Sequence, residues 1–264
     1  MILVLDVGNT NIVFGVYKDD ELIVNWRVST YKEKTSDEYS LVFKQIFEFN
    51  NINKDDIEAI IIASVVPNLY HTLKNACFKY LEKEPYFVNA QNCPIIKNLY
   101  VNPDEVGADR IINALAAYVK YKSSIIVVDI GTAITFDVVT DKGEYLGGAI
   151  APGIGISSEA LFMKTAKLPK VELKMPDNVI GKMTSESIRS GMVYGFIGLI
   201  DSIIKEILKE MNWEKKDVRI IFTGGYSQLI AKNSCYMDII DKTLILEGLN
   251  IFYKEFCLWY SLEK

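Results

Sequence analysis

The hexapeptide Asp6-Val7-Gly8-Asn9-Thr10-Asn11 has the residue types that a phosphate-binding loop requires. Glycine lets a phosphate approach the backbone, the following amide and hydroxyl groups can donate hydrogen bonds, and the carboxylate can hold a cation. A plain hairpin turn, which uses Gly and Asn only for their backbone freedom, is the structural alternative. A second segment of this kind, Asp129-Ile130-Gly131-Thr132, favours phosphate binding, because two such loops can grip one polyphosphate from both sides.

Asp6 and Asp129 each lie where a strand is expected to end, beside the expected phosphates. Two carboxylates in that position would repel the ligand unless cations intervene. The pair therefore predicts metal ions in the site, with Mg²⁺ as the first candidate. Turn capping is the alternative role of each aspartate, and the repetition makes it the less favoured one.

The segment Val106-Gly107-Ala108-Asp109-Arg110 places an acidic and a basic side chain next to each other where a helix is expected to begin. In a phosphoryl-transfer enzyme, Asp109 would take the proton of an acceptor hydroxyl and Arg110 would bind an anionic part of the substrate. Spacing alone leaves simpler roles open, because the helix dipole favours an acid at a helix N-terminus and Arg110 also suits a surface position.

Three other glycine-containing segments indicate close contacts. Thr223-Gly224-Gly225 would let the backbone lie flat against an adenine or a ribose, or form only a tight strand-to-helix turn. The segment Gly147–Gly153, GGAIAPG, is expected to line a cleft, with a strand bulge as the alternative. In the long helix expected over residues 185–211, Gly191, Gly195 and Gly198 indicate contact with another backbone, either the protein's own sheet or a second subunit.

These residues lie in a chain with an internal duplication. Residues 126–148 align without a gap with the N-terminal segment at an offset of 123 positions, which matches Asp129 with Asp6 and Glu144 with Glu21. Each half has the pattern β-β-β-α-β-α, and the expected domains are residues 1–122 and 123–264. The expected strands are residues 2–7, 12–17, 21–28, 58–66 and 218–223, and the expected helices are residues 36–50 (capped by Ser36), 67–84, 109–120, 157–164, 185–211 and 249–259.

The composition excludes several classes of protein. The 264 residues are half hydrophobic and 24% charged, which is typical of a globular protein, and the formal net charge of −5 argues against a nucleic-acid partner. The N-terminal segment lacks the basic and long apolar regions of a signal peptide, and no apolar stretch is long enough to span a membrane. The four cysteines are expected to be buried or partly buried thiols, so a cytoplasmic location is predicted.

The chain resembles the type III pantothenate kinases over nearly its full length, and five motifs in the same order carry the resemblance. They are DVGNTN (6–11), VGADR (106–110), VVDIGTAIT (127–135), GGAIAPG (147–153) and IGKMTSESIRSG (180–191). The resemblance implies an α/β fold of two duplicated ribonuclease H-like (actin-like ATPase) units, with a mixed β-sheet in each half and an interdomain nucleotide cleft. It also implies ATP-dependent phosphorylation of pantothenate to 4′-phosphopantothenate, the first step of coenzyme A biosynthesis, in a cytoplasmic homodimer whose substrate site is completed at the interface.

The resemblance further assigns roles to individual residues. Asp109 corresponds to the proton acceptor, Asp6 lies near magnesium, and Asp129 matches the ligand of a monovalent cation, K⁺ or NH₄⁺. The implied ATP contacts are Asp6, Val7, Gly8, Asn9, Thr10, Asn11, Ile12, Val13 and Thr132. The implied pantothenate contacts are Tyr100, Gly107, Ala108, Asp109, Arg110 and Thr184.

The chain departs from the family pattern at Met183 and Arg189, where Asn and Gln are expected. These substitutions bear on affinity more than on the reaction. Two other functions remain open: transfer of phosphate to or from another acceptor within the same superfamily, and an accessory role in gene regulation. Retention of Asp109, Asp129 and Thr184 favours the kinase.

Overall fold

The computed structural model describes residues 1–93 and 95–262. Contacts within the chain form two compact units, Met1–Ala116 with Ile245–Lys264, and Ala117–Leu244. This division differs from the expected one, 1–122 and 123–264, because the C-terminal helix α7 (Leu244–Leu262) packs with the first unit. The Asn250 side chain donates a hydrogen bond to the carbonyl of Asp19, and the ring centroids of Phe252 and Tyr86 lie 5.8 Å apart.

The first unit is built on a mixed sheet. Its strands have the order β3-β2-β1-β4-β5, with β1, β2 and β3 antiparallel and with β4 parallel to both β1 and β5. The elements are β1 (Ile2–Val7), β2 (Asn11–Lys18), β3 (Glu21–Ser29), α1 (Ser36–Phe49), β4 (Ala59–Ser64), α2 (Tyr70–Leu81), β5 (Tyr86–Phe87), β6 (Lys97–Asn98), most of α3 (Ala108–Tyr121) and all but the first residue of α7.

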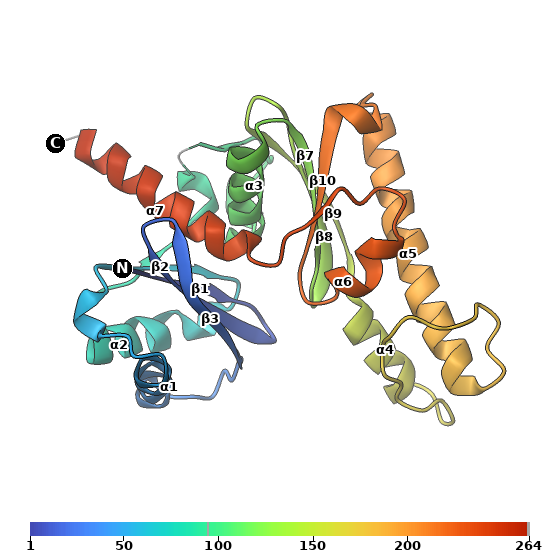
Figure 1. The fold of residues 1–264 in the computed structure, drawn as a ribbon, viewed down its shortest axis with the longest axis horizontal. Helices are drawn as coiled ribbons and strands as arrows, with labels where there is room; N and C mark the ends of the chain where they lie inside the picture. The colour runs from blue at the N-terminus through green and yellow to red at the C-terminus, as the bar shows by residue number, and fades with distance from the viewer. Residues whose placement is uncertain (94, 263–264) are drawn as a thin grey trace. The chain divides into compact units, whose positions relative to one another are not determined.

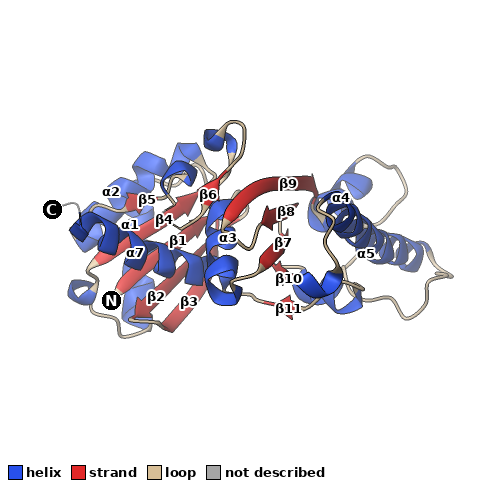
Figure 2. Ribbon diagram, turned by 90° about the horizontal axis from the view of Figure 1, so that it is seen from above, coloured by secondary structure: helices blue, strands red, loops and turns tan. Residues whose placement is uncertain are grey.

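Helices cover both faces of this sheet, which explains why β1 is apolar at nearly every position. Leu3, Leu5 and Val7 alternate along β1 and share one buried cluster with Phe43 of α1 and Leu73 of α2. Figure 1 and Figure 2 show α7 on the opposite side of the strands from α1 and α2. Because β1 and β4 are parallel neighbours, their carboxyl ends lie at the same edge of this sheet.

The second unit repeats this architecture. Five of its strands have the order β11-β10-β7-β8-β9, with the same directions as β5-β4-β1-β2-β3 in the first unit. Ile126, Val128 and Ile130 of β7 pack against Val193 and Ile200 of the long helix α5. The elements are β7 (Ser124–Ile130), β8 (Ala133–Val139), β9 (Glu144–Pro152), α4 (Ile154–Met163), α5 (Thr184–Glu210), β10 (Val218–Thr223), α6 (Ser227–Ile230) and β11 (Ile239–Ile240).

The duplicated, mixed-sheet α/β organisation expected from the sequence is confirmed, but the repeat does contain compensating gaps. Val7 pairs with Ile12 across four intervening residues, whereas Ile130 pairs with Ile134 across three. The next turn restores the offset, because Gly143, with a positive φ of 74°, makes it one residue longer than the corresponding turn between β2 and β3. The shorter first turn and the longer second turn cancel, so the ungapped alignment did not reveal either difference.

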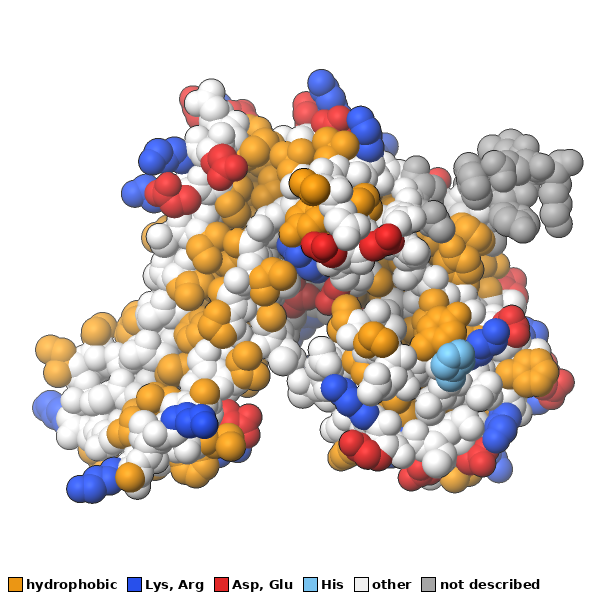
Figure 3. All heavy atoms as spheres, turned by 180° about the vertical axis from the view of Figure 1, so that it is seen from behind, with side chains coloured by type: hydrophobic (Ala, Val, Ile, Leu, Met, Phe, Trp, Pro, Cys, Tyr) orange, Lys and Arg blue, Asp and Glu red, His pale blue; other side chains and the backbone are white. Residues whose placement is uncertain are grey.

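Charged side chains of both signs mix on the surface, and the cysteines differ in their exposure. On the face shown in Figure 3, Lys and Arg side chains lie among Asp and Glu side chains. Cys77 and Cys93 are buried free thiols, whereas Cys235 is exposed, so the expectation of burial was wrong for Cys235. The side chain of Cys257 lies outside the described residues. Among helices within residues 1–93 and 95–262, none has the length and apolar character needed to cross a membrane.

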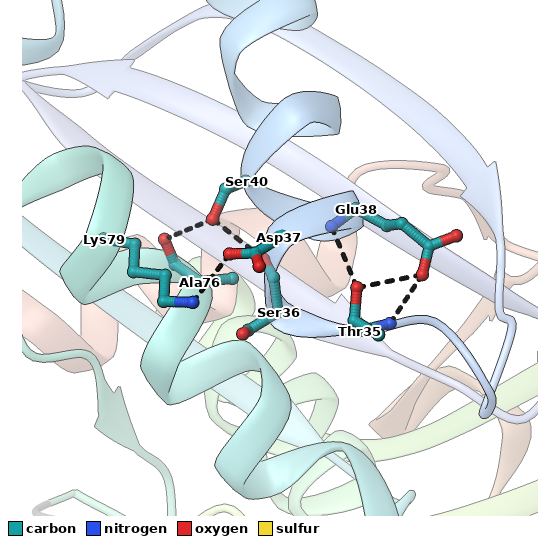
Figure 4. A network of polar contacts seen from close by, with 7 residues as sticks. All are labelled: Thr35, Ser36, Asp37, Glu38, Ser40, Ala76 and Lys79. Atoms are coloured by element: carbon teal, nitrogen blue, oxygen red, sulfur yellow. Dashed lines mark hydrogen bonds and ion pairs between the residues drawn. The ribbon is translucent and has the colours of Figure 1, made fainter.

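Helix α1 begins with a capping box one residue earlier than expected. The cap is Thr35 and not Ser36: the Thr35 hydroxyl accepts from the Glu38 N–H at 3.3 Å, and the Glu38 carboxylate accepts from the Thr35 N–H at 2.8 Å (Figure 4). The motif requires Glu or Gln three residues after the cap, and from Ser36 that position is Tyr39. The Ser40 hydroxyl, one turn into α1, donates to the carbonyl of Ala76 in α2 and ties the two helices together.

Candidate functional site

The first hairpin, between β1 and β2, presents exposed polar groups on a closed turn. The Gly8 N–H donates to the carbonyl of Asn11 at 3.0 Å, which closes the turn, and an added Cβ at Gly8 would lie only 3.2 Å from that oxygen. Asn9 and Thr10 at the tip are exposed, and Asp6 is partly exposed at the end of β1. The turn thus leaves amide and hydroxyl donors accessible next to a carboxylate, as phosphate binding requires.

Asp109 lies at the same edge of the first sheet as this hairpin. Gly107 precedes α3, and its carbonyl accepts from the N–H groups of Arg110 and Ile111. A Cβ built on Gly107 would contact the Asp109 carboxylate and would lie 3.4 Å from a Val65 methyl group. Val65 follows β4 and donates its N–H to the carbonyl of Val7, the residue before Gly8. The α3 N-terminus therefore lies at the carboxyl ends of β1 and β4.

The environment of Asp109 makes its carboxyl a stronger base than a solvated one. Burial raises the pKa of Asp109 above its ordinary value of 3.8, while the backbone N–H of Arg110 and then the Arg110 guanidinium lower it, with burial dominant. The N–H of Arg110 reaches the Asp109 Oδ1 at 2.8 Å and orients the carboxylate. Residue Asp109 as a whole is still partly accessible to solvent.

The second hairpin, between β7 and β8, holds Asp129 against glycine backbone. A Cβ at Gly131 would lie 3.6 Å from the Asp129 Oδ1, and a Cβ at Gly224 would collide with that oxygen and with the backbone of Ile130. Gly224 also has φ near +89°, a region that favours glycine. The absence of a side chain at Gly224 lets the Asp129 carboxylate lie against the backbone, and such a hard oxygen donor suits a cation. Thr132 is exposed at the tip of the hairpin.

The other glycine-rich segments differ in their structural roles. Gly147 has φ of 111° beside the register shift at Val138 and Val139, and a Cβ at Gly148 would collide with the Phe136 backbone. The bulge alternative therefore explains the first two glycines of GGAIAPG. Gly225, in contrast, is exposed with open space at its Cβ position, so a ligand can approach its backbone.

The remaining predicted substrate residues are on separate segments. Tyr100 is partly buried between β6 and α3, with its N–H bonded to the Asn98 side chain at 3.0 Å. Thr184 is the exposed first residue of α5, in the second unit. Of the two departures from the family pattern, Met183 is exposed at the N-cap of α5, and Arg189 donates from Nε to the carbonyl of Glu172.

The glycines of α5 do not pack on the protein's own sheet. Gly191, Gly195 and Gly198 are exposed, and a Cβ at any of them would meet nothing within 4 Å among the described residues. Their spacing places them on one helix face. Val193 and Ile200 of the same helix are the residues that pack on the sheet. The own-sheet alternative for the three glycines is therefore wrong.

Comparisons with known proteins give the family of this chain. The family model described as type III pantothenate kinase matches residues 2–206. A type III pantothenate kinase from Finegoldia magna is 59% identical over 251 residues, which cover 95% of this chain and 96% of that protein.

Two solved structures share the fold at lower identity. A Campylobacter jejuni protein assigned to the Baf family of transcriptional activators has a TM-score of 0.59 at 24% identity, over 97% of this chain and 98% of its own. The ROK hexokinase of Thermus thermophilus has a TM-score of 0.51 at 13% identity, over 97% and 99% of the two chains. These likenesses support the actin-like ATPase fold class. With the family model matching most of its length and a relative of 59% identity, the chain belongs to the type III pantothenate kinases.

Proposed function

We propose that this chain transfers the terminal phosphoryl group of ATP to the primary hydroxyl of pantothenate, with Asp109 as the proton acceptor. The product is 4′-phosphopantothenate, formed in the first step of coenzyme A biosynthesis. The observation that carries the assignment of Asp109 is its position beside Val65, at the edge of the sheet from which the first hairpin emerges. A base at this position can accept the proton of a hydroxyl that attacks a phosphate held by the hairpin.

Asp109 accepts the hydroxyl proton as the oxygen attacks the phosphorus. Phosphoryl transfer depends mainly on the positioning of the reactants and on charge stabilisation. One oriented carboxylate is therefore enough to accept the proton of the acceptor hydroxyl. Burial raises the pKa of Asp109 toward the working pH, which makes the carboxylate a better general base. Arg110 supplies a positive charge for the carboxylate of pantothenate, with Gly107 and Ala108 forming the adjacent wall.

The two hairpins hold the nucleotide and its cations. Residues 6–13 and Thr132 bind the ATP phosphates through backbone and hydroxyl donors. Asp6 would hold Mg²⁺, and Asp129, between Gly131 and Gly224, would hold K⁺ or NH₄⁺. When bound, these cations would supply positive charge beside the transferred phosphoryl group. Tyr100 and Thr184 are proposed as further pantothenate contacts.

A homodimer is proposed to bury the glycine face of α5. Gly191, Gly195 and Gly198 would allow a helix of the second copy to approach closely, and exposed apolar side chains such as Phe162 and Met163 of α4 belong to the same unit. Gly195→Glu, which places a charge on this face, is expected to give monomers in sedimentation equilibrium, with Gly195→Ala as the control that stays dimeric. A monomeric wild-type chain would contradict the dimer. We also propose that the protein is cytoplasmic.

The decisive experiment measures ADP release with ATP, Mg²⁺ and pantothenate, in parallel K⁺ and Na⁺ buffers. Wild-type turnover is expected to require pantothenate and K⁺, and Asp109→Asn is expected to lose about 10²- to 10⁴-fold in kcat, the usual contribution of a general base. Asp217→Asn, at an exposed aspartate of the second unit, is the matched control. Full activity of Asp109→Asn would remove Asp109 from this role, and absence of turnover in both buffers would favour another acceptor or an accessory function.

A further inference from the structure

Thr30, the residue that follows β3, makes two hydrogen bonds to the first hairpin. Its hydroxyl donates to the carbonyl of Gly8 at 2.7 Å, and its backbone N–H donates to the carbonyl of Thr10 at 2.9 Å. None of the motifs that indicated phosphate chemistry includes Thr30. The two bonds fix two peptide groups at the tip of a turn whose side chains are exposed.

These bonds determine where the hairpin's N–H groups point. In a planar trans peptide, the C=O and the following N–H point in opposite directions. Because Thr30 holds the carbonyl oxygens of Gly8 and Thr10, the N–H groups of Asn9 and Asn11 point away from Thr30. An N–H of defined direction is what a phosphate-binding turn must supply.

Thr30 is itself held in place by helix α1. The hydroxyl of Tyr39, a fully buried α1 residue, donates to the carbonyl of Tyr31 at 2.9 Å. The next residue along the chain from Thr30 is thus anchored to the core of the first unit. The contact between Thr30 and the hairpin therefore joins the hairpin to a rigid element.

The second unit contains the backbone half of this arrangement and lacks the hydroxyl half. Gly153 follows β9 as Thr30 follows β3, and its N–H donates to the carbonyl of Thr132 at 3.1 Å. A Cβ at Gly153 would lie within 3 Å of the carbonyl oxygens of Gly131 and Thr132, so no side chain fits there. The backbone bond is common to both hairpins, and the hydroxyl bond is specific to the first.

We propose that Thr30 is a positioning residue for ATP, whose hydroxyl holds the Gly8–Asn9 peptide so that the Asn9 N–H faces the phosphates. This inference rests on the proposed binding of ATP by the first hairpin. It predicts that loss of the hydroxyl weakens the use of ATP selectively, because Thr30 is not among the proposed pantothenate contacts.

The test compares Thr30→Val, which keeps the shape and loses the hydroxyl, with Thr30→Ser, which keeps the hydroxyl. For Thr30→Val we expect the KM for ATP and the Kd for ADP, measured by calorimetry, to rise about 3- to 10-fold, the usual effect of one hydrogen bond. Thr30→Ser is expected to stay within about 2-fold of wild type, as is the KM for pantothenate in both variants. Ser29→Ala, at the exposed neighbouring position, is the matched control and should match wild type.

Several outcomes would overturn the inference. Wild-type values for Thr30→Val would show that the hydroxyl does not position ATP. Equal increases in both KM values with a lowered melting temperature would show a purely structural role. If the wild type binds ADP but does not phosphorylate pantothenate, weaker ADP binding by Thr30→Val would still support the positioning role while the proposed function fails.

Discussion

Gly107→Ala should impair catalysis by displacing the Asp109 carboxylate. The added methyl group would lie well inside 3.0 Å of the Asp109 Oδ1, closer than real Cβ contacts allow, so the carboxylate must move by at least about half an ångström. That movement also disturbs the 2.8 Å bond from the Arg110 N–H. A misplacement of about 1 Å can cost about 10²-fold in rate, so we expect kcat to fall about 10- to 100-fold.

The assay is steady-state ADP release, combined with a double-mutant cycle. If Gly107→Ala acts through Asp109, the substitution should cost little further activity in an Asp109→Asn background. The KM for ATP should stay close to wild type. Replacing glycine by alanine at a helix N-cap costs about 1 kcal/mol, so the melting temperature should fall by only a few degrees. An unchanged kcat, or losses that simply add in the double variant, would refute the reasoning.

Other substitutions test the two units separately. Because the folded-state pKa of Asp109 is raised, its contribution to stability is full below the unfolded pKa and is lost as pH rises through the folded pKa. Asp109→Asn should therefore be more stable than wild type at pH 7 in denaturant titrations, with the difference vanishing near pH 3, and an equal difference at both pH values would contradict this. Gly224→Ala, at a positive φ and against Asp129, should lower the free energy of unfolding by more than about 1–2 kcal/mol and remove the activation of turnover by K⁺, and a wild-type K⁺ titration would contradict this. Tyr145→Phe removes a 2.8 Å bond to the buried Asp137 carboxylate and should cost about 1.5–3 kcal/mol in thermal unfolding, and a wild-type melting temperature would argue against that bond.

The sequence predicted the strands and their repetition well, because these depend on local patterns. The apolar run at 2–7 and the strand at 218–223 were predicted to the residue, and most long helices to within a few residues. The helix at α4 begins three residues earlier than expected, at Ile154. Short-range hydrophobic periodicity and turn residues carry this information without knowledge of the tertiary structure.

The features that the sequence did not predict depend on contacts between distant residues. The packing of α7 with the first unit includes the Asn250–Asp19 contact, which joins residues far apart in the sequence. Thr30 could have been found, since the offset of 123 matches it with Gly153 of a conspicuous motif. Nothing in residue type, however, indicated that its hydroxyl would reach Gly8.

The differences between the two hairpins suggest why a duplicated site would bind two kinds of ligand. The first hairpin has the longer turn, the added hydroxyl bond of Thr30, and donors held in fixed directions, which suits a polyphosphate. In the second, the shorter turn and Gly224 bring backbone against the Asp129 carboxylate. The residue in the first sheet that corresponds to Gly224 is Ser64, because β4 pairs with β1 as β10 pairs with β7. Glycine backbone against the Asp129 carboxylate favours the proposed monovalent-cation site in the second unit. The fixed donors of the first hairpin favour the proposed phosphate contacts there, beside the Mg²⁺ proposed at Asp6.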